Sequence, residues 1–162
     1  MNMMNRNTIL SFEQATQQVF SEIGFSGIGS SDSENLSTGT NEFIATVGLT
    51  GQIQGFLSLG GTRASAIEFV RQMFQYMGMD EEEDNDFGQS CREALGELVN
   101  QICGRSSMLL ELESINIDIT PPTILVGTDL FLDVDKLEDI LHKDITGEFG
   151  TFNLFVGVRS YM

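Results

Sequence analysis

Two polar side chains in the stretch 90–112 have the residue types and the spacing that a chemical site needs. Glu97 and Asn100 stand three residues apart, so on a helix they are neighbours about one turn along the same surface. A carboxylate offers charged acceptor oxygens, whereas a carboxamide is neutral and both donates and accepts hydrogen bonds. Glu93 and Gly104 fall in the same narrow stripe. The stripe is therefore the first candidate site.

The elements that must position this pair follow from the rest of the same stretch. At 100° per residue an apolar side lies opposite the polar stripe, and it consists of Cys91, Leu95, Leu98, Val99 and Ile102. This pattern predicts a long amphipathic helix from near Asp86 to around Glu111, buried on its apolar side. Gly104 marks either a bend in this helix or a place where a partner's backbone approaches closely, and the sequence favours neither.

The remaining periodicities predict an α+β fold, an antiparallel sheet with long helices packed on one face. The chain length of 162 residues predicts a single domain spanning 1–162, with residues 1–8 disordered. Before the long helix we expect a helix over 12–23, opened by a capping box of Ser11 and Gln14, a hairpin over 42–49 and 53–59, and a helix over 64–77. After it we expect strands over 115–119, 123–126, 129–133, 137–146 and 149–158.

Two details of these elements bear on packing. The second helix is expected to bury Ile67, Val70, Phe74 and Met77, which recur at helical spacing. Gly48 and Gly55 lie inside the predicted hairpin strands, where glycine indicates a bulge or a close approach of another backbone.

Composition excludes several classes of function. The net charge is −16, from 24 acidic and 8 basic residues, so nucleic acids and anionic membranes would be repelled. No apolar run approaches the roughly 20 residues of a membrane span. The cysteines Cys91 and Cys103 would lie about 18 Å apart along the helix and cannot pair. With no recognisable leader segment, unpaired thiols favour the cytoplasm.

The sequence offers few residues suited to binding a metal or to nucleophilic catalysis. His142 is the one histidine, so the chain has no histidine cluster for a metal and no convincing pair of nucleophile and base. The acidic run from Asp80 to Asp86 could be taken for a cation loop, but it lacks the central glycine and the distal glutamate of an EF-hand. A solvated linker is the favoured interpretation, and a small cation-binding protein is the weaker alternative.

The stretch ALGELVNQICG resembles the chemotaxis phosphatases CheX, CheC and FliY, and CheX most of all. The pattern of this family is Asp or Ser-x-x-x-Glu-x-x-Asn, followed further along by a proline. Glu97 and Asn100 match its centre, and Pro121 or Pro122 would be the proline. Glu93 departs from Asp or Ser, since it keeps a carboxylate but adds a methylene group. The flanks GLTGQIQGFLSLGG and ITPPTILVG extend the resemblance over residues 42–127.

The resemblance implies a phosphatase that hydrolyses the aspartyl phosphate of a CheY-type response regulator. Asn100 would position the attacking water and Glu97 would form a salt bridge with the regulator's lysine, while Glu93, Gly104, Pro121 and Pro122 are candidates for supporting roles. No cofactor of its own is expected, because the regulator brings the magnesium ion. The alternative is a binding module that docks a response regulator or a flagellar-motor component without hydrolysis. The resemblance also implies a homodimer joined edge to edge, for which the C-terminal β segment could supply the edge.

Overall fold

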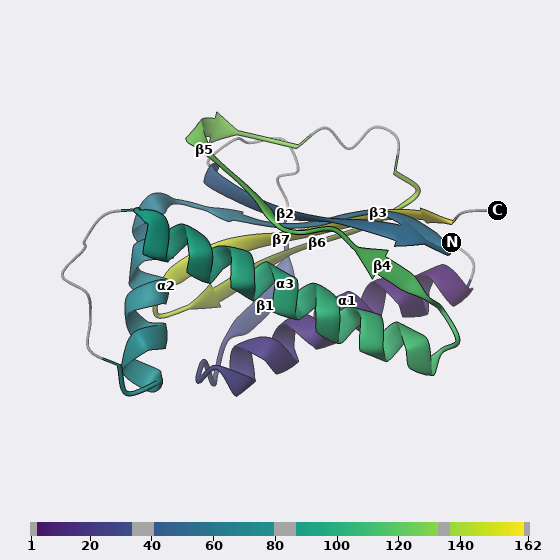
Figure 1. The fold of residues 1–162 in the computed structure, drawn as a ribbon, viewed down its shortest axis with the longest axis horizontal. Helices are drawn as coiled ribbons and strands as arrows, with labels where there is room; N and C mark the ends of the chain where they lie inside the picture. Colours follow the sequence, from purple (N-terminus) through teal and green to yellow (C-terminus); the bar gives the residue numbers. More distant parts are fainter. Residues whose placement is uncertain (1–2, 34–40, 80–86, 133–136, 161–162) are drawn as a thin grey trace.

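The computed structural model describes residues 3–33, 41–79, 87–132 and 137–160, and these form two layers. One layer is a seven-stranded sheet in the order β1-β6-β7-β3-β2-β4, with β5 also paired to β2, and every pairing is antiparallel. The other layer consists of three helices on one face of the sheet (Figure 1). The predicted α+β fold with long helices on one face is confirmed.

The elements have the following bounds, in chain order: α1 (Met3–Glu22), β1 (Gly29–Asp32), β2 (Asn41–Gly51), β3 (Ile53–Gly61), α2 (Arg63–Tyr76), α3 (Gln89–Leu112), β4 (Ile117–Ile119), β5 (Thr123–Leu130), β6 (Asp139–Gly147) and β7 (Gly150–Ser160). The predicted hairpin is β2–β3, and residues 137–146 supply β6. The long helix runs through Gly104 without interruption. The strand expected over 123–126 lies in β5, which continues to Leu130, whereas residues 131–132 of the strand expected over 129–133 lie beyond its end.

The first helix begins well before its predicted start. Residues 3–8, expected to be disordered, belong to α1. Ser11 is therefore no cap, and its Oγ donates to the carbonyl oxygen of Asn7 one turn earlier in the helix (3.0 Å). Ile9 and Phe12 are buried in the core, so tertiary packing extends the helix towards the N-terminus where local capping signals predicted none.

The second helix has its predicted position and buries Val70 as expected, but it is rotated about its axis relative to the prediction. Phe69 is fully buried, whereas Phe74 is only partly buried and Met77 is 57% exposed. Phe69 stacks on Phe25 with ring centroids 4.5 Å apart and meets the edge of Phe149 at 5.3 Å. This aromatic cluster joins segments that are distant in the sequence, and it sets the rotation of α2.

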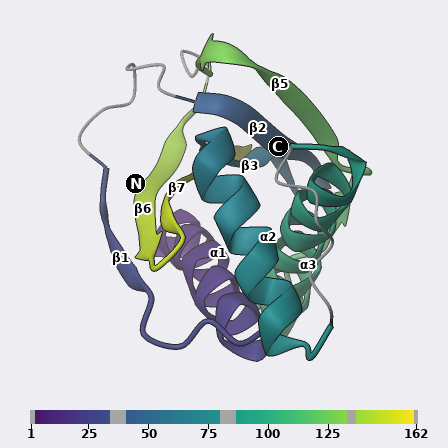
Figure 2. The ribbon, with the colours of Figure 1, turned by 90° about the vertical axis from the view of Figure 1, so that its left-hand side faces the viewer.

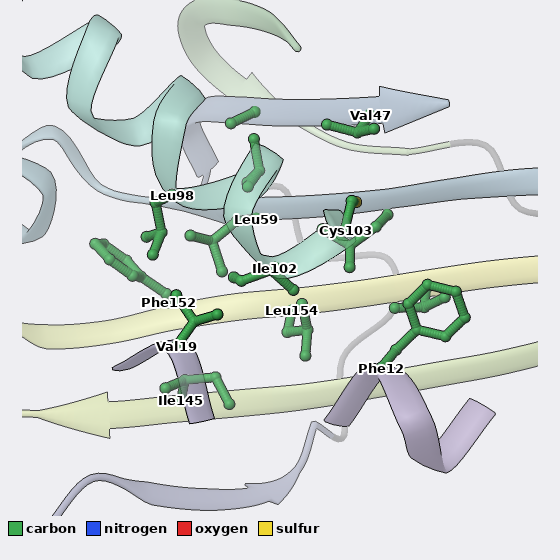
Figure 3. Packing of buried hydrophobic residues seen from close by; sticks show 14 of the residues in the cluster. Phe12, Val19, Val47, Leu59, Leu98, Ile102, Cys103, Ile145, Phe152 and Leu154 are labelled. Carbon is green, nitrogen blue, oxygen red and sulfur yellow. The ribbon is translucent and has the colours of Figure 1, made fainter. Parts of the chain in front are cut away.

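The core lies between the helices and the sheet. In Figure 3, Phe12 and Val19 from α1 and Leu98, Ile102 and Cys103 from α3 point towards the side chains of the strands. Figure 2 shows the sheet curving around the three helices. Complete burial of a leucine or isoleucine contributes about 1.5–3 kcal/mol, so these contacts hold α3 firmly in one rotation about its axis.

The C-terminal strand does not form an edge of the sheet, contrary to the expectation for dimerisation. β7 is paired on both sides, with β6 and with β3. Its inward residues Phe152, Leu154, Val156 and Val158 are buried, and so is the outward Phe155. The described sheet has its edges at β1 and at β4 with β5.

The glycine inside β3 marks the close backbone approach that the sequence indicated. A Cβ atom on Gly55 would lie 1.9 Å from the carbonyl oxygen of Gly157 in β7. Gly104 of α3 differs, because an added Cβ atom would find nothing within 4 Å. Replacing each glycine with alanine should therefore have opposite effects on stability.

We expect Gly55→Ala to lower the free energy of unfolding by more than about 2 kcal/mol, because two paired strands must separate to admit the methyl group. Gly104→Ala is the matched control and should raise it by roughly 0.5–1 kcal/mol, since alanine is the better helix former. Urea denaturation of the two variants measures both changes. An unchanged stability of the Gly55 variant would show that β3 and β7 are not held as closely as described.

Candidate functional site

A shallow groove of about 400 Å³ brings the helix pair and the proline turn together. Its lining residues come from α3, from the end of β4 and from the segment that joins β4 to β5, and they are Glu97, Asn100, Ile119, Thr120, Pro121 and Pro122. Both prolines line the groove beside the helix pair.

The buried side of α3 determines how the pair faces the groove. Leu95, Leu98 and Ile102 are buried, and they alternate with the polar stripe around the helix. Glu97 is exposed and Asn100 is half-buried. Because the helix cannot rotate without exposing its apolar side, both polar side chains project from a rigid base.

The proline turn is held in place by Thr120. The Oγ1 atom of Thr120 accepts a hydrogen bond from the amide of Gly48 in β2 (2.8 Å), and the amide of Thr120 donates to the carbonyl oxygen of Gly48 (3.0 Å). Pro122 packs on the helix, since a Cβ atom on Gly96 would lie 3.6 Å from its Cγ atom. The turn is thus tied to the sheet on one side and contacts α3 on the other.

Sequence reasoning missed Thr120 and Gly96. A threonine directly before two prolines is a signal for a side chain that bonds to the backbone in a turn. The partner of this threonine, Gly48, stood out as a site of close approach, but its distance of 72 residues in the sequence hid the connection. Gly96 lies on the buried side of α3, where a small residue lets the turn sit close to the helix axis.

The polar atoms of the groove are suited to binding rather than to nucleophilic attack. One oxygen of Glu97, Oε1, accepts a hydrogen bond from Gln101 Nε2 (3.2 Å), which restrains the carboxylate one turn along the helix. Burial raises the pKa of the Cys91 thiol to about 11 and that of Cys103 to about 12, so neither is a thiolate at neutral pH. Neither cysteine lines the groove.

Two candidates from the helix stripe lie outside this groove. Glu93 lines a neighbouring pocket instead, and its Oε1 atom accepts from Gln89 Nε2 (2.9 Å). Gly104 lies one turn beyond Asn100, on an open part of the helix surface. The structure therefore unites Glu97 and Asn100 with the prolines but leaves Glu93 and Gly104 at the margins.

The remaining candidates lie elsewhere. His142 is on β6, half-buried beside Phe155, and burial lowers its pKa below the usual value. Among the described residues no group of three or more His, Cys, Asp and Glu side chains could hold a metal ion. The acidic run from Asp80 to Asp86 falls outside the described residues. In the part of the chain that the structure describes, no helix is long and apolar enough to span a membrane.

Comparisons with known proteins show what the chain resembles in sequence. CheY-P phosphatase CheX of Thermotoga maritima is 33% identical over 90 residues, which make up 56% of this chain and 55% of the relative. The chain thus matches about half the length of that curated relative.

Solved structures share the fold over almost the whole chain. A chemotactic CheC-like protein from Shewanella oneidensis has a TM-score of 0.77 at 18% identity, covering 96% of this chain and 99% of its own. The CheX–CheY–BeF3–Mg complex from Borrelia burgdorferi has a TM-score of 0.67 at 15% identity, covering 94% and 97%. The family described as chemotaxis phosphatase CheX matches residues 43–146, which include both walls of the groove. The chain therefore belongs to the CheX family.

Proposed function

We propose that this protein is a phosphatase that hydrolyses the aspartyl phosphate of a CheY-type response regulator. The single observation that carries the proposal is the groove in which Glu97 and Asn100 face Pro121 and Pro122. Two further findings support it: the curated relative is a CheY-P phosphatase, and a structure with the same fold is a complex with CheY, BeF3 and magnesium.

Asn100 would position the attacking water. An acyl phosphate is already activated, so hydrolysis needs a water held in line with the leaving oxygen more than it needs a strong base. The carboxamide can accept a hydrogen bond from this water and donate one to a phosphoryl oxygen. Because it is neutral, it does not repel the phosphoryl group as a carboxylate would. Half-burial in the groove limits the orientations of the side chain.

Glu97 would dock the regulator by a salt bridge with its active-site lysine. The carboxylate is exposed and lies one turn before Asn100, so the contact would orient the helix as Asn100 enters the regulator's site. Two exposed ions gain little in water, but the pair strengthens when the interface excludes solvent. The magnesium ion would belong to the regulator, and we propose no cofactor of the protein's own.

A partner of this kind would place the protein in the cytoplasm.

We also propose that the protein forms a homodimer through a free edge of the sheet. β5 is the edge that supports this proposal, because it pairs only with β2 among the described strands and carries Leu125, which is 54% exposed.

Asn100→Ala should reduce the accelerated dephosphorylation of a cognate regulator at least about 100-fold, because the water is no longer held in line. Binding of the regulator should largely survive. Phosphate release measured with each regulator of the source organism tests this expectation, with Asn116→Ala, an exposed asparagine outside the groove, as the matched control. A variant that works at the wild-type rate would overturn the assignment. Wild-type protein that binds a regulator without releasing phosphate would instead be a binding module.

Glu97→Gln should weaken binding roughly tenfold and change the turnover at saturation much less, because it removes a docking charge and leaves the water-positioning amide. The dissociation constant should also depend less on salt than that of the wild type. Glu111→Gln, the same change at an exposed position on α3, is the control. Equal affinities and salt dependences for the wild type and the Glu97 variant would contradict the salt bridge.

Leu125→Lys should shift a dimer towards monomer, since a lysine on an edge strand opposes pairing with another strand. Sedimentation equilibrium over a range of concentrations measures the change. Leu10→Lys, an equivalent change on the exposed side of α1, should leave the assembly as it is. A wild-type protein that is monomeric throughout would refute the dimer, and equal shifts in both variants would refute the edge.

A further inference from the structure

A second pocket lies directly beside the groove, between the three helices. It has a volume of about 340 Å³ and is mainly apolar. Its apolar residues come from α2, from α3 and from the residue after the end of α1, and they are Ile23, Met73, Phe74, Met77, Ala94 and Leu98. We call this site the helix pocket. The role proposed for Glu97 and Asn100 does not account for it.

The helix pocket is present because α2 turns Phe69 towards the core. That rotation leaves Phe74 partly buried and Met77 at the surface, although the sequence predicted both as core residues. Met77 is 57% exposed, and Met79, two residues on, is 51% exposed. Exposing apolar side chains to water in this way is unfavourable unless another surface covers them.

The rim of the helix pocket is acidic. Glu93 and Glu97 both line it, and none of the described residues that line it is a lysine, an arginine or a histidine. An apolar interior with carboxylates at its edge is complementary to an apolar side chain flanked by cationic groups. It is a poor match for an anionic or purely polar ligand.

Glu97 connects the two sites. It lines the helix pocket as well as the groove, so its carboxylate stands on the ridge between them. A group that forms an ion pair with Glu97 from the groove side must therefore bring neighbouring atoms of the same partner close to the helix pocket. Glu93 is four residues earlier, about 6 Å along the helix axis, which is within the footprint of one protein surface.

We infer that the helix pocket receives an apolar side chain of the response regulator, presented next to the lysine that Glu97 meets. This inference rests on the proposed function and adds the element that selects among regulators. The contact supplies apolar burial at a position removed from the phosphoryl group. Met73 and Met77 are flexible and polarizable, so the pocket fits apolar side chains of different shapes and selects for an apolar group over a polar or acidic one.

The experiment measures the affinity for regulators loaded with beryllofluoride and magnesium, together with the turnover at saturation. Ala94→Leu fills the pocket and should raise the dissociation constant at least tenfold while turnover at saturation stays near that of the wild type. Ala64→Leu, the same change at an exposed position of α2 outside the pocket, is the matched control and should change neither quantity. Equal affinities of the two variants would overturn the inference.

A second pair of variants guards against misfolding of the filled pocket. Met77→Glu adds a carboxylate at an exposed position of the pocket mouth and should weaken binding at least tenfold. Met79→Glu adds the same charge nearby but outside the lining, so its effect should be at least fivefold smaller. Equal effects of the two changes would assign the loss to general repulsion and overturn the inference.

The two readouts separate this inference from the proposed function. If the protein binds a regulator but does not hydrolyse its phosphate, the proposed phosphatase activity fails. The affinities of the pocket variants and their controls then still test whether the helix pocket contributes to binding. If hydrolysis occurs and the affinities of the pocket variants equal that of the wild type, the pocket inference fails and the activity stands. Binding of no loaded regulator by the wild type would refute both.

Discussion

Burial of one side of α3 is the constraint on which both sites depend. Leu95, Leu98 and Ile102 can all be buried in only one rotation of the helix, and that rotation places Glu97 and Asn100 outward. Turning the helix would expose several of these side chains at a cost of about 1.5–3 kcal/mol each. A single hydrogen bond, such as the one from Gln101 to Glu97, contributes on the order of 1 kcal/mol. The direction in which the polar pair points is therefore set by the core, and local hydrogen bonds only refine it.

The width of the groove depends on a second constraint, which is set by β2. This strand contributes Phe43, Ala45 and Val47 to the core beneath the helices, and it pairs along its outer side with both β4 and β5. The proline turn between those two strands is bonded to β2 through Thr120 and Gly48. One strand thus fixes the turn by hydrogen bonds and contributes to the core on which the helix packs. Neither wall can shift without disturbing the same strand, so the groove keeps its width.

The sequence predicted most of the elements because their signals are local. The stripe on α3, the β2–β3 hairpin and the strand at 137–146 all follow from periodicity and turn residues. The predicted start of α1 and the predicted rotation of α2 were wrong, because Ile9 and Phe69 pack against residues far along the chain. The pair Glu97 and Asn100 was visible through its spacing and its resemblance to a family pattern. Thr120 escaped prediction because only the fold brings it to Gly48. What a sequence hides here is mainly contact between distant segments.

The position of Glu97 between the groove and the helix pocket has a consequence for recognition. A net charge of −16 acts on any partner from a distance, and it favours every basic surface alike. At physiological salt this attraction fades over about 8 Å, so it speeds encounter without choosing among related regulators. Discrimination must come from contacts that depend on which side chain the regulator presents, and not on charge alone. If the groove receives an aspartyl phosphate, as we propose, it recognises a feature that all activated regulators share and would not distinguish them. A surface side chain that differs among regulators can do so, and the helix pocket lies where such a side chain would be placed once Glu97 holds the lysine. The groove would then recognise the phosphoryl group, and the helix pocket would select the regulator. Both sites lie on α3, and Glu97 belongs to both.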